Sequence, residues 1–462
     1  MGLTLTCCTN IFFSNLTWRR GSLLFLIAYS LLPSIAQAVP SFARQTGAEC
    51  AACHTVYPEL TPFGRQFKLR GYTLGELNAE NSPTGKLPIA ALLQISRTET
   101  AQTNTPGAMP SDFPNDRKTL VQAAGLYYAG KITDNAGALV QYSYNGFEKR
   151  WAVEMADIRY ANSLKLSNGK EFLYGVTLSN SPTITDPYNS TSMWGFPYSS
   201  TAEVMPIQGP IIDMALASKV AGPGVYALYN DWLYAEVAAY RTTNTGALRP
   251  LGLGNWSKTA NVVDGYAPYW RVAVQREIDG KHSLSLGAFG LDANVFPGNN
   301  TSGGTDRFRD YGLDGQYQYI ADEHIFSLQG RYTKEQQTRS ESFATMAASN
   351  LNNDLASLKL GGNYYFKRQY GIRTQYFKTT GSSDTNLYNM GGMGTPVMGS
   401  INANPETSGW VNELVYLPLP NTTLSLRYTS YSMFNGASTN YDGNGRNAKD
   451  NNSIYLLARI LF

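Results

Sequence analysis

Short segments in which apolar and polar residues alternate recur from about Leu87 to the end of the sequence. Successive side chains of a β-strand point to opposite faces, so each segment predicts a strand with one apolar and one polar face. One segment alone fits a half-buried strand of a soluble sandwich. Many in series favour an all-β fold, a transmembrane antiparallel β-barrel with apolar faces toward lipid and residues such as Arg459 toward the lumen. The clearest apolar faces are Ile454, Leu456, Ala458, Ile460 and Phe462; Phe326, Leu328, Gly330 and Tyr332; Leu424, Leu426 and Tyr428; and Leu313, Tyr317 and Tyr319.

The composition favours a membrane barrel over the other classes. Charged residues make up 15% of the chain, against roughly 25% in typical soluble proteins. Disorder is excluded by the 31 Tyr, 19 Phe and 7 Trp, because so many aromatic residues can bury enough surface to offset the conformational entropy of the chain. Beyond residue 38 no apolar run approaches the length of about 18 residues that a spanning helix needs. A closed barrel is the remaining way to satisfy backbone hydrogen bonds in lipid.

The first 38 residues have the features of a secretory signal peptide. Arg19 and Arg20 precede an apolar run over 23–32, and Ala36-Gln37-Ala38 supplies a cleavage site of small residues. The apolar run is short for a membrane span, so a retained anchor is the weaker alternative. We expect the mature protein to begin at Val39 and to keep two of the four cysteines.

The connections between the alternating segments predict about sixteen strands. Barrels of this kind have short periplasmic turns and long outer loops. Reading Val225 to Tyr240 as one long tilted strand keeps short and long connections in alternation and gives sixteen, while fourteen or eighteen remain alternatives. The connection 181–209 is rich in proline and aromatic residues, and we expect it to fold into the lumen as a constriction. Long connections are expected around 242–266, 292–307, 336–354, 381–407 and 433–451, and short ones at 367–369 and 417–420.

The motif Cys50-Ala51-Ala52-Cys53-His54 predicts one covalently attached haem c. In this motif both thiols add to the haem vinyl groups, and the adjacent His54 is placed to ligate the iron. The alternatives are a disulfide followed by a chance histidine, or a zinc site. A zinc site needs about four ligands, and no further cysteine or nearby histidine is present. The whole chain holds three histidines, so one that directly follows the second cysteine favours haem.

The segment that carries this motif, residues 39–86, is too short to enclose a haem with a core of its own. A sixteen-strand barrel leaves a wide lumen, so we expect the segment to lie inside the barrel or to plug its periplasmic mouth. The predicted organisation is therefore a signal peptide (1–38), a monohaem cytochrome segment (39–86) and a porin-like barrel (87–462).

The second axial ligand of the iron is not evident from the sequence. Met109 lies at a suitable distance along the chain but falls in an expected outer loop. Met155 shares a strand face with Asp157, which predicts that it faces the lumen, although a methionine in a strand is usually only packing. His282 and His324 fall at expected periplasmic turns on lipid-side faces, which favours structural roles.

The N-terminal segment resembles a known family. Its motifs are Phe42-Ala43-Arg44-Gln45-Thr46-Gly47, Cys50 to His54, the stretch from Pro58 to Arg65, and Gly71-Tyr72. They are similar to those of the fused monohaem cytochrome-porins of the bacterial outer membrane, whose best-known members oxidise extracellular iron(II). A terminal Phe462 on an alternating strand also resembles the C-terminal signal of outer-membrane proteins. The resemblance covers the motif closely and the barrel in general layout and length.

The resemblance implies that extracellular Fe(II) gives an electron to the haem and that a periplasmic c-type cytochrome or other soluble carrier removes it. Lumen carboxylates such as Asp157, Glu236 and Asp314 could attract the cation, but such groups are usually only solvated or paired. One alternative is a porin for small solutes whose haem segment is a plug. Another is a conduit for a manganese, sulfur or organic reductant. A net charge of +3 gives no support for nucleic-acid binding, and no phosphate-binding or hydrolytic motif occurs.

Overall fold

The computed structural model describes residues 40–55, 57–75, 87–103, 115–147, 149–188, 191–194, 203–213, 215–242, 261–389 and 396–462. The described residues all belong to one compact unit. The expected signal peptide and Met109 lie outside the described residues. None of the helices in these ranges has the length and the apolar character needed to cross a membrane.

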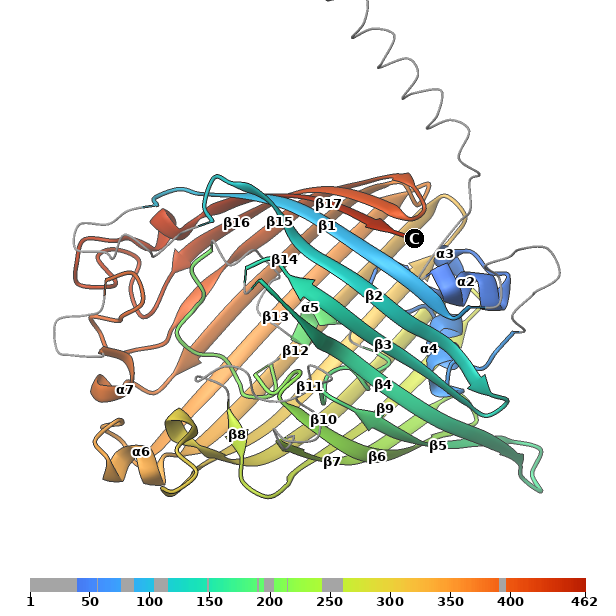
Figure 1. Ribbon diagram of the computed structural model, residues 1–462, viewed down its shortest axis with the longest axis horizontal. Coiled ribbons are helices and arrows are strands. Elements are labelled where there is room, and N and C mark those ends of the chain that lie inside the picture. Colours follow the sequence, from blue (N-terminus) through green and yellow to red (C-terminus); the bar gives the residue numbers. More distant parts are fainter. Residues whose placement is uncertain are drawn as a thin grey trace, which may run out of the picture. The chain divides into compact units, whose positions relative to one another are not determined.

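Within the described residues, sixteen antiparallel strands pair side by side and close into a ring (Figure 1). The first strand pairs with the last, from Leu92 opposite Leu461 to Thr100 opposite Ser453. The predicted strand number is therefore confirmed. A two-residue strand, β8 (Val262–Val263), pairs with the end of β10 and lies outside this count. The sixteen are β1 (Ile89–Thr100), β2 (Thr119–Thr133), β3 (Ala136–Asn145), β4 (Arg150–Lys165), β5 (Glu171–Ser179), β6 (Val220–Tyr229), β7 (Leu233–Thr242), β9 (Ala267–Ile278), β10 (His282–Phe296), β11 (Asp306–Ile320), β12 (His324–Thr338), β13 (Asn352–Phe366), β14 (Tyr370–Gly381), β15 (Thr407–Leu419), β16 (Thr422–Met433) and β17 (Ser453–Leu461).

The prediction of one long strand from Val225 to Tyr240 is wrong. This stretch belongs to a hairpin of β6 and β7, in which Tyr229 pairs with Leu233. Asn230 and Asp231 form the centre of the turn with φ of 47° and 57°. Positive φ at both central residues is the geometry of the tight hairpin turn whose twist matches the flanking strands, and Asn and Asp tolerate it best after glycine. The turn is so short that the alternation continues through it in the sequence.

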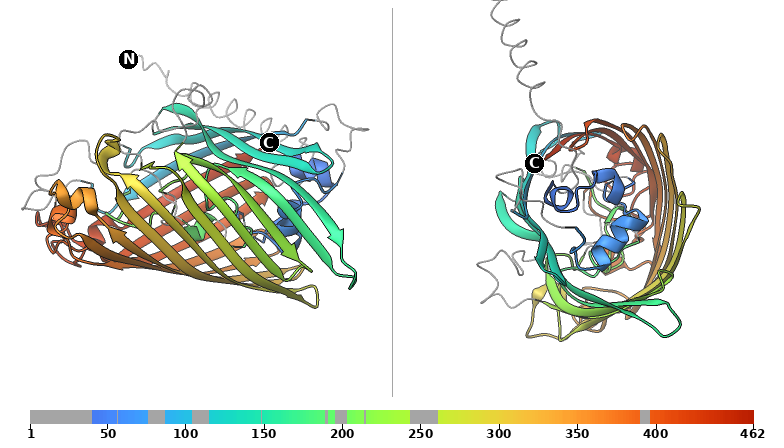
Figure 2. Two further views of the ribbon diagram at one scale, coloured as in Figure 1. Left: turned by 90° about the horizontal axis from the view of Figure 1, so that it is seen from below. Right: turned by 90° about the vertical axis from the view of Figure 1, so that its right-hand side faces the viewer.

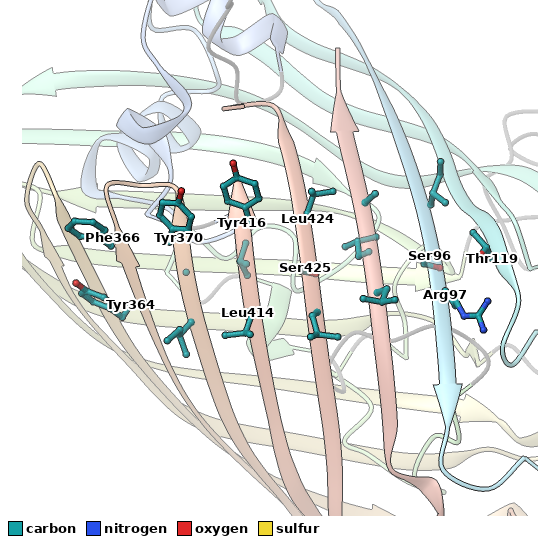
Figure 3. Close-up of a pocket in the computed structure, with 18 residues that line it drawn as sticks. Ser96, Arg97, Thr119, Tyr364, Phe366, Tyr370, Leu414, Tyr416, Leu424 and Ser425 are labelled. Carbon is teal, nitrogen blue, oxygen red and sulfur yellow. The ribbon is translucent and has the colours of Figure 1, made fainter. Parts of the chain in front are cut away.

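The two faces of the strands follow the predicted alternation. On β17, Ile454 and Leu456 are 44% and 46% exposed, whereas Ser453 and Tyr455 are 2% and 0% exposed. Similar side chains form a shallow apolar groove across β13 to β17 and β1, in which Tyr370, Leu414 and Tyr416 lie on the outer surface (Figure 3). An apolar outer face around a closed ring of strands is what a barrel in lipid requires.

The connections divide between the two ends of the barrel. Short turns such as 367–369, between β13 and β14, lie at one mouth, which is the periplasmic mouth by the rule for such barrels. Long connections lie at the other end, where α6 (Ser340–Ala344) and α7 (Thr385–Asn389) stand far from the N-terminal helices (Figure 1). Two 3-10 turns, η2 (Pro297–Asn299) and η3 (Ala448–Asn451), also belong to these connections.

Two stretches of chain fill the lumen. The plug segment, residues 40–55 and 57–75, contains α2 (Pro40–Thr46), α3 (Cys50–Cys53) and α4 (Pro62–Leu69). It lies within the ring at the short-turn mouth (Figure 2, right). The inner loop, residues 180–188, 191–194 and 203–213, contains α5 (Thr191–Trp194). Its Trp194 is fully buried, with its ring 4.8 Å from that of Phe289 on β10. The expected folding of this connection into the lumen is confirmed.

Candidate functional site

The Cys-x-x-Cys part of the motif forms a single turn of helix, α3, that packs on the start of α4. Pro62 occupies the first turn of α4, and the Thr61 hydroxyl accepts a hydrogen bond from the Gly64 amide (3.1 Å), as an N-cap should. The same hydroxyl donates to the Ala52 carbonyl (2.5 Å). A Cβ at position 64 would lie 2.1 Å from the Cys53 carbonyl oxygen, so only glycine allows the two helices to approach this closely.

His54 follows α3 in a state suited to binding a metal. Its Nδ1 lies 3.2 Å from the Glu59 carbonyl oxygen. Because a carbonyl oxygen only accepts, Nδ1 must donate, and the lone pair of the ring is then on Nε2. Desolvation by burial lowers the pKa of His54 to about 4, so the imidazole is neutral. A neutral ring whose other nitrogen is fixed by a carbonyl is the usual form of a histidine that ligates a metal.

A largely apolar cleft lies beside this motif. Cys53 and His54 line it from the plug segment, and burial raises the pKa of the Cys53 thiol to about 11. Strands β2, β3 and β4 close the opposite side with Tyr127, Leu139 and Met155. A flat apolar group with an iron at its centre fits this donor set, because the cleft offers aromatic and aliphatic walls and an imidazole. The other lining residues include Phe42, Tyr57, Leu60, Phe67, Lys68, Tyr72, Asp157 and Asp186.

Two buried charged residues fasten the plug segment to one wall of the barrel. The Arg65 guanidinium donates to Ser283 (2.5 Å), Gln316 (3.1 Å) and Gln318 (3.3 Å) on β10 and β11. The Glu59 carboxylate accepts from Ser327 (2.7 Å) on β12 and from Asn363 on β13. The sequence places both residues in the N-terminal motif but gives them no role, since their partners are remote along the chain.

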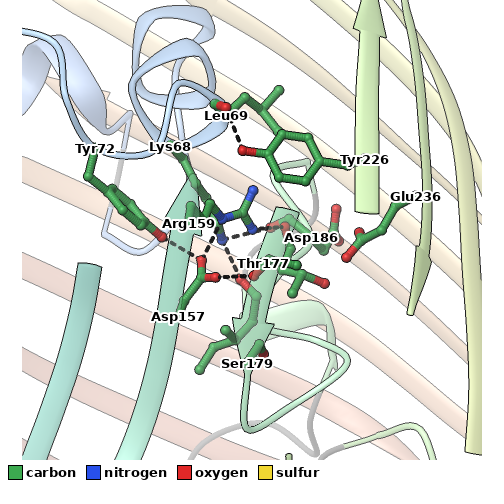
Figure 4. A network of polar contacts seen from close by, with 12 residues as sticks. Lys68, Leu69, Tyr72, Asp157, Arg159, Thr177, Ser179, Asp186, Tyr226 and Glu236 are labelled. Carbon is green, nitrogen blue, oxygen red and sulfur yellow. Dashed lines mark hydrogen bonds and ion pairs between the residues drawn. The ribbon is translucent and has the colours of Figure 1, made fainter. Parts of the chain in front are cut away.

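A second set of contacts fastens the plug segment to the opposite wall (Figure 4). The Tyr72 hydroxyl donates to the Asp157 carboxylate on β4 (2.6 Å), which also accepts a hydrogen bond from Arg159 Nε (2.8 Å). The Tyr226 hydroxyl donates to the Leu69 carbonyl at the end of α4 (2.7 Å). The plug segment is thus held by strands on both sides, in agreement with the expectation that it occupies the barrel mouth.

The lumen carboxylates that were candidates for attracting a cation are engaged within the protein. Asp157 pairs with Arg159, and Asp314 makes a two-pronged pair with Arg271 at 2.7 and 2.8 Å. Glu236 accepts from the Tyr234 hydroxyl (2.9 Å). Among the described residues, no group of three or more His, Cys, Asp or Glu is arranged to hold a metal ion. Asp157 lines the cleft, whereas the other two lie elsewhere in the lumen.

The candidate axial ligands differ in whether they line the cleft. Met155 lines the same cleft as His54, so its predicted lumen-facing position is confirmed. His282 and His324 stand next to short turns, where each ring nitrogen Nδ1 lies 2.8 Å from a tyrosine hydroxyl, that of Tyr317 or Tyr364. Their positions next to short turns are as expected.

Comparison with known proteins finds likeness to solved structures. No family model and no curated protein matches the chain. An anion-selective porin from Comamonas acidovorans is 12% identical with a TM-score of 0.44, over 81% of this chain and 98% of the porin. The outer membrane channel DcaP of Acinetobacter baumannii is 12% identical with a TM-score of 0.43, over 81% and 96%. OmpT, an outer membrane protein of Vibrio cholerae, is 11% identical with a TM-score of 0.40, over 81% and 96%.

The class of protein follows from the chain's own architecture. A closed ring of sixteen antiparallel strands, an apolar outer face and a polar lumen define an outer-membrane β-barrel of porin-like fold. The outer face of the strands contacts the membrane lipid.

Proposed function

We propose that this chain is an outer-membrane electron-transfer protein that oxidises extracellular Fe(II). In this proposal Cys50 and Cys53 hold one haem c covalently, and His54 ligates its iron. The observation that carries the proposal is the Cys-x-x-Cys-His turn inside a barrel mouth, with its histidine neutral, fixed at Nδ1 and lining an apolar cleft.

The chain's own residues would bind, orient and shield the group. The bond from His54 Nδ1 to the Glu59 carbonyl fixes the ring orientation, while Phe42, Phe67 and Leu139 exclude water from the cleft. When bound, haem supplies a one-electron carrier whose potential depends on its axial ligands and on burial. Apolar walls of this kind favour the less charged, reduced state.

Iron is the substrate in this proposal and not a resident of the lumen. One electron leaves Fe(II) at the outer side, giving Fe(III), and a periplasmic c-type cytochrome or other soluble carrier accepts it. Asp157 and Asp314 are each paired with an arginine of the barrel wall. This pairing supports a lumen that does not store the cation. The choice of Fe(II) rests on the resemblance of the N-terminal motifs.

The barrel fold by itself supports a second candidate more directly than it supports iron oxidation. This candidate is a porin for small solutes in which the plug segment is a structural or sensory part. The observation in its favour is the closed sixteen-strand ring of porin-like fold. The filling of the lumen by two segments favours the electron-transfer proposal, because both stand in the path of a diffusing solute.

Stopped-flow reduction of the purified, haem-loaded chain by Fe(II) tests the first candidate. We expect the haem spectrum to become that of the reduced state at the working pH of the organism, and we expect no signal from protein in which Cys50 and Cys53 are both replaced by alanine. If Fe(II) does not reduce the haem while a manganese, sulfur or organic reductant does, the protein is an electron conduit for that donor and the assignment of Fe(II) as substrate is wrong.

Liposome swelling tests the second candidate. We expect vesicles that contain the full chain to swell in isotonic sugar no faster than empty vesicles. Swelling at the rate of an open porin would favour the solute channel.

A further inference from the structure

Strand β4 has an irregularity that brings Met155 toward the plug segment. Gln141 of β3 pairs with Met155 and the next residue, Tyr142, pairs with Val153, so Glu154 is an extra residue in β4. Such a β-bulge turns the side chains around it, and bulges are common beside functional sites. The Glu154 carboxylate accepts from Gln141 (2.8 Å), another lumen residue.

The bulge is held from the side of β4 that has no strand partner there. The Ser218 hydroxyl donates to the Glu154 carbonyl (2.6 Å). The Ala156 amide donates to the side-chain oxygen of Asn180 (2.8 Å). The backbone on both sides of Met155 is therefore held by residues that flank the inner loop, which fixes the point at which the Met155 side chain leaves β4.

The thioether sulfur of Met155 is available in the cleft as a metal ligand. The Tyr72 hydroxyl is bound to Asp157, and Asp157 is paired with Arg159. Lys68 Nζ donates to the carbonyls of Ile184 and Asp186. The thioether of Met155 lines the same cleft as His54 without a hydrogen bond to the described residues. A thioether is a recognised axial ligand of c-type haem iron, opposite histidine.

We propose that Met155 of the barrel wall is the second axial ligand, opposite His54 of the plug segment. This inference rests on the proposed function, because it requires the haem. It makes the iron the point at which plug segment and barrel are joined, so the cytochrome segment is complete only inside its own barrel. Methionine opposite histidine also sets a higher reduction potential than a second histidine would.

The test uses the full chain, matured with covalent haem, and two substitutions at this site. Met155→Leu keeps the apolar volume and removes the sulfur, whereas Met155→His restores a strong ligand of another kind. Met193→Leu is the matched control, because Met193 is another buried methionine in the lumen and lies outside the cleft lining. The readouts are the sulfur-to-iron charge-transfer band of the ferric protein, carbon monoxide binding to the ferrous protein, and the reduction potential.

We expect the charge-transfer band in the wild-type and Met193→Leu proteins and its complete loss in Met155→Leu, which should become able to bind carbon monoxide. Met155→His should remain low-spin without the band and with a lower potential. A wild-type protein without the band, or a Met155→Leu protein that keeps it, overturns the assignment and leaves Lys68 as the next donor to examine. Failure of Fe(II) to reduce a haem that shows the band would count against the proposed substrate and not against Met155.

Discussion

The plug segment and the inner loop both fill the lumen, but they are fastened to the barrel in different ways. The plug segment places single buried charges among neutral partners, as Arg65 does with Ser283 and two glutamines. The inner loop instead places its carboxylates against cations of the wall. Asp186 lies 3.1 Å from Arg271 Nε, and Asp213 lies 2.8 Å from Arg331 and 2.7 Å from Lys359.

This difference indicates a division of tasks. Opposite charges inside a protein attract strongly, and removal of one member leaves the other unpaired at a large cost. Ion pairs of this kind suit a segment whose task is to close the lumen. Neutral hydrogen bonds around a buried charge fix its orientation but compensate less of its desolvation cost than an opposite charge would. This arrangement suits a segment whose task is to position a cleft. Changes in the inner loop should therefore alter permeation, and changes in the plug segment should alter the cleft.

Arg271→Met should have the largest effect. It leaves Asp186 and Asp314 without the cation that neutralises them and should lower the free energy of unfolding by about 3–5 kcal/mol. A urea titration of the barrel in lipid vesicles measures this change, and liposome swelling should show faster entry of small solutes. Arg276→Met on the same strand, where the side chain is exposed, is the control and should change stability by less than about 0.5 kcal/mol. Equal stability of both variants would show that the buried ion pairs do not hold the inner loop in place.

Glu59→Gln should have an intermediate effect. The Glu59 carboxylate accepts from Thr55, Ser327 and Asn363, and an amide replaces one accepting oxygen with a donor. We expect a loss of about 1–3 kcal/mol, seen as faster amide hydrogen exchange in the plug segment. The exposed Glu323, replaced by Gln in the same way, should leave exchange unchanged. Faster solute entry without a change in exchange would contradict the division of tasks.

Arg70→Ala should have the smallest effect, although its pair with Glu171 is two-pronged at 3.1 and 2.8 Å. The two side chains are 26% and 34% exposed, so water screens the pair and the expected change is below about 1 kcal/mol. A double-mutant cycle with Glu171→Ala measures the coupling directly. A coupling free energy as large as the loss expected for Arg271→Met would show that this partly exposed ion pair, and not the buried contacts, holds the plug segment.

The alternation in the sequence predicts the barrel because it depends on one local rule. Ile454 and Leu456 face lipid for the reason that the pattern gives, and the turn 367–369 falls where a short connection is expected. The hairpin at Asn230 is missed because a turn with two positive φ angles occupies so few residues that the alternation hides it. Positive-φ residues such as an Asn-Asp pair are the signal that would have located it.

The contacts that build the site cannot be predicted in the same way. The Cys50 to His54 motif can be recognised because its residues are adjacent in the sequence. The position of Met155 in the alternating pattern of its strand predicts that it faces the lumen. Its place in the same cleft as His54 depends on the bulge at Glu154 and on how the plug segment docks. Asn363, which binds Glu59, is 304 residues away along the chain. Any polar residue on a lumen face could have filled that role, so only the three-dimensional structure selects it.

The proposed covalent haem in the plug segment can be tested by the mass of the protein. The most direct measurement is the intact mass of the full chain, produced in a host with haem-attachment machinery, extracted from the outer membrane and then denatured. We expect a mass that exceeds the mature polypeptide by one haem, and loss of this increment when Cys50 and Cys53 are both replaced by alanine. A folded wild-type barrel with the mass of the polypeptide alone would contradict it.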